Sequence, residues 1–293
     1  MQTLFLIDAN ALVHRCFHAL PPFTGPKGQP TGALYGLSSI LIKILREPPK
    51  KDFITALFDR PEPTFRKEIF EDYKIHRPKA PDALVSQIIE AHKLFGVFGI
   101  KIFELPGFEA DDLIGTMVEK FKNQNDLRIV ILSGDLDTLQ LAENDKVVAE
   151  TLKIGVSQTI IYNSQGVKEK YGVSPKQMPD YKALVGDISD NIPGVPGIGP
   201  KTAAILIQKY QTIENLLRNC SEEKSCQKIL NSEKQVLLSK ELSKIRRDVP
   251  LPPTELNDLQ YQKIPLPGII EYFKALGFQG LIKRLETTDF GTQ

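Results

Sequence analysis

Apolar segments that end directly in an acidic residue recur along the first half of the chain, and this recurrence constrains the fold more than any other feature. Residues 3–7 and 52–58 each have the composition of a buried strand, and Asp8 and Asp59 follow them. Helix-like segments alternate with these strands, which predicts a mostly parallel α/β sheet flanked by helices over residues 1–150. The strands are expected at 3–7, 52–58, 100–105, 127–132, 147–150 and 159–162, and the helices at 11–20, 32–46 and 82–98.

Acids follow four of the predicted strands. Parallel strands place their carboxyl ends at one rim of the sheet, where ligands bind in open α/β folds. Asp187 and Asp190 lie at i and i+3 in the second half of the chain, and they join this rim if that half folds back. The acids expected there from the sheet itself are Asp8, Asp59, Glu109, Asp111, Asp112, Asp135 and Asp137.

Each group of acids has a simpler explanation when it is taken alone. The segment 109–112 fits an ordinary helix start, where acids are stabilised by the helix dipole. Asp135 and Asp137 fit a turn in which Asp bonds its own backbone, and the pair after residue 186 fits a helix cap. These explanations do not account for the joint placement of the acids after four strands.

A cluster of carboxylates takes up protons or cations, because two like charges 4 Å apart repel by about 4 kcal/mol at an effective dielectric near 20. All-carboxylate ligands favour Mg²⁺, or Mn²⁺ in its place, over zinc. Two such ions would activate a water and hold a phosphodiester, so phosphodiester hydrolysis is the predicted chemistry. A helix that starts near residue 108 puts Glu109 and Asp112 on one face, which leaves Asp111 to reach between the two ions.

Cations and aromatic residues interleave between residues 64 and 79. Aromatic rings stack on bases while Arg and Lys contact phosphates, so the pattern predicts a path for single-stranded nucleic acid. A solvated charged face is the alternative interpretation, and Phe70 fits a core position as well. A helix capped by Thr64 would carry Arg66, Phe70, Tyr73 and Arg77 at spacings of four, three and four, with Lys74 beside them.

From residue 174 onward the sequence consists of helices broken by Gly and Pro, with a glycine-rich turn before a helix predicted at 201–210. Gly197 and Gly199 bracket one apolar residue, which lets the backbone approach a phosphate at the helix N-terminus. Followed by Lys201 and Thr202, this turn is typical of a helix-hairpin-helix element, although a plain helical hairpin has the same outline. Further helices are predicted within 213–242 and at 268–285.

The composition is ordinary for a globular protein, with 41% hydrophobic and 25% charged residues and a net charge of +1. No apolar run reaches membrane-spanning length and the N-terminus lacks a signal-peptide pattern, so an intracellular protein without membrane association is expected. Three cysteines without a CxxC pair predict reduced thiols rather than a disulfide framework.

Motifs along nearly the whole chain resemble one family. The chain looks like the 5′ nuclease (flap endonuclease) domain found at the N-terminus of bacterial DNA polymerase I. The segments that carry the resemblance are FLID at 5–8, HALPP at 18–22, PTGALYG at 30–36, TFR at 64–66, GFEADD at 107–112, GDLD at 134–137, GDISDNIPG at 186–194, GIGPKTA at 197–203 and DVPL at 248–251.

The resemblance implies a PIN-like nuclease domain at 1–173 with a helical arch at about 61–98. It also implies a helical DNA-binding region at 174–293, with a helix-three-turn-helix element at about 180–210. All nine acids of the family's two metal clusters are present. They are Asp8, Asp59, Glu109, Asp111 and Asp112 for the first cluster, and Asp135, Asp137, Asp187 and Asp190 for the second.

The resemblance assigns roles to the bases and to the turn as well. Residues 197–201 match a duplex-binding turn that holds K⁺ in the family, and Thr202 follows it. Asn10 departs from the family pattern, in which small residues and a serine follow the first acid. The residues implied to orient the 5′ end and the scissile phosphate are Arg66, Tyr73, Lys74 and Arg77, and those implied to be catalytic are Lys74, Arg77, Asp111 and Asp135.

The predicted function is therefore that of a two-metal nuclease that cuts 5′ flaps, nicks and recessed 5′ ends of DNA, removes RNA primers at RNA–DNA junctions, and leaves a 5′ phosphate. We expect a monomer in the cytoplasm, at the nucleoid, which is either free-standing or a piece of a longer polymerase. A separate DNA polymerase is a further candidate partner. The alternatives are a PIN-type ribonuclease and a non-catalytic binder of DNA junctions.

Overall fold

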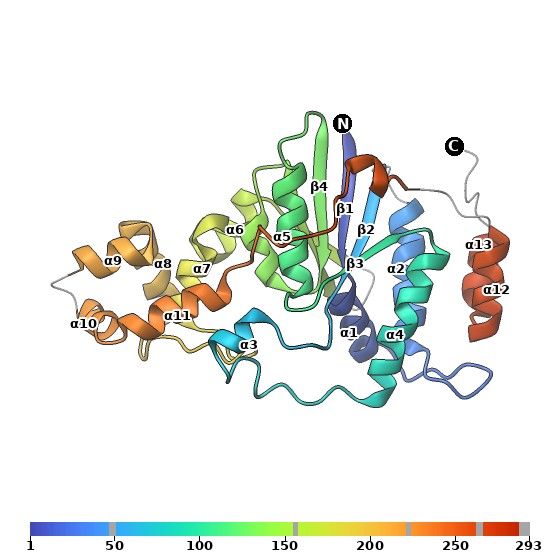
Figure 1. Cartoon of the computed structure of the whole chain (residues 1–293), viewed down its shortest axis with the longest axis horizontal. Coiled ribbons are helices and arrows are strands. Elements are labelled where there is room, and N and C mark those ends of the chain that lie inside the picture. Colours follow the sequence, from blue (N-terminus) through green and yellow to red (C-terminus); the bar gives the residue numbers. More distant parts are fainter. Residues whose placement is uncertain (47–50, 155–157, 221–223, 262–265, 287–293) are drawn as a thin grey trace.

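A six-stranded sheet forms the centre of the computed structural model, which describes residues 1–46, 51–154, 158–220, 224–261 and 266–286 (Figure 1). The strand order is β3-β2-β1-β4-β5-β6, and every neighbouring pair is parallel except β5 and β6. The predicted mostly parallel α/β sheet is thus confirmed. The strands are β1 (Gln2–Asp8), β2 (Phe53–Phe58), β3 (Lys101–Glu104), β4 (Leu127–Ser133), β5 (Val147–Ile154) and β6 (Gln158–Tyr162).

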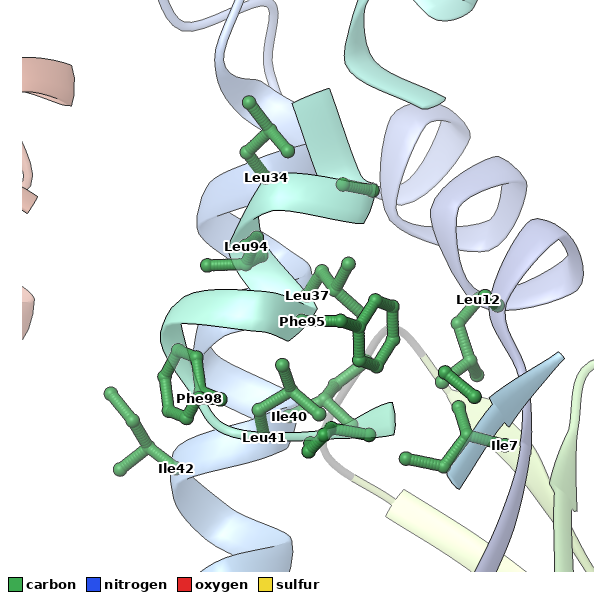
Figure 2. Close-up of a cluster of buried hydrophobic side chains, with 14 of the residues drawn as sticks. Ile7, Leu12, Leu34, Leu37, Ile40, Leu41, Ile42, Leu94, Phe95 and Phe98 are labelled. Atoms are coloured by element: carbon green, nitrogen blue, oxygen red, sulfur yellow. The ribbon is translucent and has the colours of Figure 1, made fainter. Parts of the chain in front are cut away.

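The two faces of the sheet are covered by different helices, as the alternation of side chains along β1 requires. Phe5 and Ile7 face a core built with α1, α2 and α4, in which Ile7, Leu12 and Phe95 lie close together (Figure 2). Leu4 and Leu6 face the opposite core, built with α5. The covering helices are α1 (Ala9–Ala19), α2 (Gly32–Arg46), α4 (Asp82–Val97) and α5 (Ala110–Phe121).

A second group of helices packs around its own core beyond the β6 edge of the sheet (Figure 1). Cys220 and Cys226 are joined by a disulfide there, so the prediction of reduced thiols is wrong for this pair, while Cys16 is free and buried. The elements concerned are η1 (Leu136–Leu141), α6 (Ser164–Tyr171), η2 (Pro175–Gln177), α7 (Met178–Val185), α8 (Pro200–Tyr210), α9 (Ile213–Asn219), α10 (Lys224–Leu230) and α11 (Glu233–Ser243).

After α11 the chain returns to the sheet, so the last part of the region predicted as helical, 174–293, packs against the two faces of the sheet. Ile245 and Val249 pack with α5, and η3 (Leu256–Leu259) follows them on the same face. Helices α12 (Leu266–Leu276) and α13 (Gln279–Glu286) pack on the other face, against α2 and α4 (Figure 1). The single helix predicted at 268–285 is broken at Gly277, which has a φ of 78°.

The segment predicted as a helical arch contains one short helix and a run of turns before α4. Helix α3 (Phe65–Ile69) ends before Phe70, so the predicted continuous helix through Arg77 is wrong. Lys74 has a φ of 57° because its N–H donates to the carbonyl of Asp190 at 2.9 Å, a contact with a distant segment. Tertiary contacts therefore override the helical spacing of this segment.

Candidate metal centre and nucleic-acid interface

The carboxyl ends of β3, β2, β1 and β4 lie side by side in the sheet, and acids follow all four. Asp8 is the last residue of β1, and Asp59 comes directly after β2. Glu109 caps the N-terminus of α5, the helix that follows β3. Asp135 caps η1, which follows β4. The rim expected from the sequence is therefore present, and its members are fixed by neighbouring strands.

Asp8 and Asp59 are held by short contacts with uncharged groups. Ser133 Oγ donates to Asp8 Oδ2 at 2.7 Å, and the N–H of Ala110 donates to Asp59 Oδ1 at 2.7 Å. Burial raises the pKa of Asp8 to about 7, with added repulsion from Asp59, and burial also raises the pKa of Asp59. Asn10 Oδ1 accepts from the N–H of Asp59 at 3.2 Å, so the residue that departs from the family pattern supports an acid of the rim.

Asp111 lies at the start of α5 with one oxygen unused. Its Oδ1 is buried and has no hydrogen-bond partner among the described residues. Burial, together with repulsion from Asp112, raises the pKa of Asp111 well above the usual range. A buried carboxylate oxygen without a donor is a ligand position that a cation satisfies. Because α5 begins at Ala110, Glu109 is its capping residue, and it forms a capping box with Asp112, whose Oδ2 accepts from the Glu109 N–H at 3.1 Å. The same guanidinium nitrogen of Arg66 contacts both acids, so the two lie on one side of the start of α5 as the sequence suggested.

Asp112 and Arg66 form a buried pair that faces away from solvent. Arg66 is only 1% exposed, and its guanidinium binds both oxygens of Asp112, at 2.6 and 2.8 Å. It also donates to the carbonyls of Leu242 and Lys244, at 2.9 and 3.0 Å. In this structure the two side chains are therefore engaged with each other, and neither is open to solvent.

The second group of acids joins the end of β4 to the turn after α7. Lys182, in the last turn of α7, contacts Asp137 Oδ1 and lies 2.7 Å from Asp187 Oδ2. Burial raises the pKa of Asp137 to about 6 despite the ammonium beside it. Asp187 has its pKa lowered to about 2, because the contacts with Lys182 and Ser189 outweigh its partial burial. One lysine thus links two acids from different segments.

Two residues of the 64–79 segment, Tyr73 and Lys74, bridge the two groups of acids, and Arg77 pairs with the second group. The Tyr73 hydroxyl lies 3.2 Å from Glu109 Oε2 and 3.1 Å from Asp190 Oδ2. Lys74 Nζ lies 2.8 Å from Glu109 Oε1, and Arg77 pairs with Asp190 Oδ1. Tyr73 is only 4% exposed, so the structure does not offer its ring as a stacking surface. Lys74 and Arg77 keep their charges beside the acids.

The turn that carries Asp187 and Asp190 depends on two close-packed glycines. Gly186 has a φ of 80°, and a Cβ on it would lie 2.5 Å from the backbone nitrogen of Gly194. An antiparallel bridge between Asp187 and Ile192 closes the turn. Side chains at either glycine would push the two backbones apart and move the acids.

The glycine-rich turn before α8 is on the surface. Gly197 has a φ of 81°, and Gly199 caps α8. Gly197, Gly199 and Lys201 are exposed, while Thr202 is half-buried. The helix predicted at 201–210 corresponds to α8, and α7 pairs with it to form the predicted helical hairpin.

The donor set fits divalent cations, although its side chains do not converge as they stand. Among the described residues, no three carboxylate, imidazole or thiol groups lie in a geometry that holds a metal ion. Lys74, Arg77 and Lys182 occupy positions between the acids instead. The unused oxygen of Asp111 and the all-oxygen chemistry of the set match hard cations such as Mg²⁺.

Three residues of the rim were not found by sequence reasoning. Ser133 and Asn10 hold Asp8 and Asp59, and Lys182 links Asp137 to Asp187. Ser133 ends β4 and could have been suspected from its place beside Asp135, and Asn10 was noted in the sequence without a role. Lys182 had no comparable signal, because it lies five residues before Asp187 within a helix.

Acids at the end of a parallel sheet, joined to an exposed helical hairpin, are the features of a metal-dependent nuclease. Comparison with known proteins gives the same class. The description "5'-3' exonuclease, N-terminal resolvase-like domain" matches residues 3–172, and "5'-3' exonuclease, C-terminal SAM fold" matches residues 173–266. The chain belongs to the 5′-3′ exonuclease family, and it is a nuclease that hydrolyses phosphodiester bonds.

Individual relatives differ in length. A 5′-3′ exonuclease of Aquifex aeolicus is 37% identical over 98% of this chain and 96% of its own. DNA polymerase I of Caldicellulosiruptor bescii is 41% identical over 96% of this chain, which spans only 33% of that relative. A solved flap endonuclease of bacteriophage T5, in a complex with DNA and metal ions, has the same fold, with a TM-score of 0.67, 22% identity and coverage of 97% and 96%.

The structure contains no helix, within its described ranges, that is long and apolar enough to cross a membrane.

Proposed function

We propose that the chain is a structure-selective nuclease that cuts DNA at 5′ flaps, nicks and recessed 5′ ends, removes RNA primers at RNA–DNA junctions, and leaves a 5′ phosphate. The observation that carries this proposal is that acids follow four neighbouring strand ends at one rim of the sheet, beside a buried Asp111 oxygen that has no donor among the described residues. Family membership supports the reaction class.

Two Mg²⁺ ions, or Mn²⁺ in their place, are the proposed cofactors. When bound, such ions activate the attacking water and neutralise charge on the phosphodiester. Asp112 is not among their proposed ligands, because Arg66 and the Arg246 N–H occupy its oxygens. The acids proposed to hold them are Asp8, Asp59, Glu109 and Asp111 for the first ion, and Asp135, Asp137, Asp187 and Asp190 for the second.

Two cations of the 64–79 segment are proposed to act on the scissile phosphate. Lys74 and Arg77 lie beside Glu109 and Asp190, so a phosphate held over the acids would come within their reach. A fixed ammonium and guanidinium stabilise the charge that develops in the transition state. Arg77 is half exposed, which leaves it accessible to a strand approaching from solvent.

The turn before α8 is proposed to hold the duplex part of the substrate. Its exposed backbone and the start of α8 can meet a phosphate, and the exposed Lys201 adds a charge. Thr202 would donate to the same phosphate, and K⁺ would bind the turn from Gly197 to Lys201. We further propose that the protein acts as a monomer inside the cell, where a DNA polymerase supplies the strand that is displaced.

A cleavage gel with a 5′-labelled flap substrate tests this function. With Mg²⁺ the flap should be released at its base, and EDTA should abolish cleavage without unfolding the protein. Asp135→Asn serves as the matched variant, because it should lose cleavage and retain DNA binding. Cleavage that persists in EDTA would contradict the metal chemistry. Preference for single-stranded RNA would indicate a ribonuclease, and binding without cleavage would indicate a junction binder.

A further inference from the structure

Lys182 lies between two acids proposed to hold the second ion. Its side chain is 13% exposed, and its ammonium contacts Asp137 and lies 2.7 Å from Asp187 Oδ2. The three residues come from separate elements, since Asp137 belongs to η1, Lys182 to α7 and Asp187 to the turn after α7. The ammonium therefore occupies the space between carboxylates that a cation of the second group would need.

The other oxygen of Asp187 is already engaged. Its Oδ1 accepts from the N–H of Ser189 at 2.9 Å and from Ser189 Oγ at 2.7 Å. The oxygen facing Asp137 is therefore the one that remains for an ion, and Lys182 is bound to it. An ion that binds Asp137 and Asp187 together has to replace this lysine contact.

The first group of acids differs at this point. Asp8 accepts from Ser133 and the Ala11 N–H, and Asp59 accepts from the Ala110 N–H, all of which are uncharged donors. Among the described residues neither of these two carboxylates has an ammonium or guanidinium at ion-pair distance, and the cationic contacts of this group are those of Lys74 and Arg66 with Glu109. Asp137 and Asp187 share their charge with an ammonium, which lowers the attraction for a second cation.

We propose that Lys182 is a resident cation of the second acidic group and that a divalent ion binds there only by displacing its ammonium. This rests on the proposed two-ion function. Lysine suits such a role because its charge is compact and its four-carbon stem is flexible, so the ammonium can leave without movement of α7. The consequence is that the two ions bind with unequal affinity, and that the second acidic group stays neutralised before the ion arrives.

Titration of metal-free protein with Mn²⁺, following free Mn²⁺ by electron paramagnetic resonance, tests this directly. Wild type should bind one ion tightly and a second at least tenfold more weakly. Lys182→Met keeps the length of the side chain and removes the charge, so the second ion should bind at least tenfold tighter while the first changes less than twofold. Lys182→Arg keeps the charge and should leave the second ion weak.

The control is Lys176→Met, which removes an exposed lysine of η2 at the start of the same helical segment. It should bind both ions as wild type does. Thermal unfolding is the second readout: in EDTA, Lys182→Met should unfold at a lower temperature than wild type, and Mn²⁺ should raise its unfolding temperature by more.

The proposal is wrong if the second ion binds Lys182→Met no more tightly than it binds wild type, because Lys182 would then be a permanent structural partner. The proposal is also wrong if Lys176→Met tightens binding of the second ion as much as Lys182→Met does. The effect would then come from the loss of one positive charge anywhere on the protein. Failure of the proposed function looks different. In that case neither wild type nor any variant binds Mn²⁺, and no flap is cleaved.

Discussion

The two groups of acids at the rim are built in different ways. In the first group, Asp8 and Asp59 are fixed by strand ends and by uncharged donors such as Ser133 Oγ and the Ala110 N–H. In the second group, Asp137, Asp187 and Asp190 are fixed by cationic side chains from other segments. The sheet positions Asp8 and Asp59 without a cationic partner, although Glu109 of the same group pairs with Lys74. The second group depends throughout on charge pairing between segments that are far apart in the chain.

This difference teaches which acids the fold alone can position. Neighbouring parallel strands place their carboxyl ends side by side, so the residues that directly follow β1 and β2 are positioned by the sheet itself. The second group needs the α7 turn to dock on the sheet, and Lys182 and Arg77 neutralise it once docked. Substitutions in the first group should therefore mainly lower the rate of cleavage. Substitutions in the second group should also weaken the docking of the α7 turn on the sheet.

The largest effect is expected from Asp111→Asn. The amide cannot replace the buried carboxylate charge, so cleavage of the flap substrate should fall by roughly a hundredfold to a thousandfold or more. Asp137→Asn should lose less, because Lys182 already shares its charge. Single-turnover rates at saturating Mg²⁺ measure both. Equal losses in the two variants would remove the distinction between the groups.

The buried pair of Arg66 and Asp112 should contribute most to stability. Arg66→Ala leaves Asp112 charged and 0% exposed, which should lower the free energy of unfolding by roughly 3–5 kcal/mol. The matched control is Arg77→Ala, whose guanidinium is half exposed and should matter by about 1 kcal/mol or less. Urea unfolding in EDTA gives both values. If the two variants lose similar free energies of unfolding, the difference in burial does not make the Arg66–Asp112 pair more stabilising than the Arg77–Asp190 pair.

A backbone change should disturb the second group while sparing the first. Gly186 has a φ of 80° and a ψ of 178°, a region open only to glycine, so Gly186→Ala should destabilise the protein by about 1–3 kcal/mol. Gly166→Ala in α6 is the control, since its Cβ would meet only ordinary contacts at 3.5 Å. Mn²⁺ titration of Gly186→Ala should show loss of the second ion and retention of the first. Loss of both ions would show that the groups form one unit.

Much of this arrangement could be predicted from the sequence, because it depends on local patterns. Apolar runs ending at Asp8 and Asp59 define β1 and β2, and their parallel pairing follows from the helices between them. Gly197 and the residues after it indicated the hairpin leading into α8. The acids of the rim were found for the same reason, since each follows a strand or a turn that the sequence marks.

The remaining features depend on contacts between distant segments, which no local spacing reveals. Arg66 is charged and lies among other cations, so the sequence suggested a surface residue, but it reaches Asp112 and two carbonyls at the end of α11. Tyr73 and Arg77 were spaced for a helix, yet Lys74 adopts a positive φ to pair with Asp190. Lys182 had no signal at all until α7 and η1 were placed together.

The smallest effect should come from Lys201, which belongs to neither group. Lys201→Ala removes one phosphate contact at the start of α8, so DNA affinity should fall several-fold and the salt dependence of binding should become shallower by about one unit. Fluorescence anisotropy over a range of salt concentrations measures this. Mn²⁺ binding and single-turnover cleavage of bound DNA should stay at wild-type values, because the exposed turn before α8 makes no contribution to the acids. If cleavage in the bound complex falls as well, the turn also positions the scissile phosphate. DNA binding and catalysis would then not be separable in this protein.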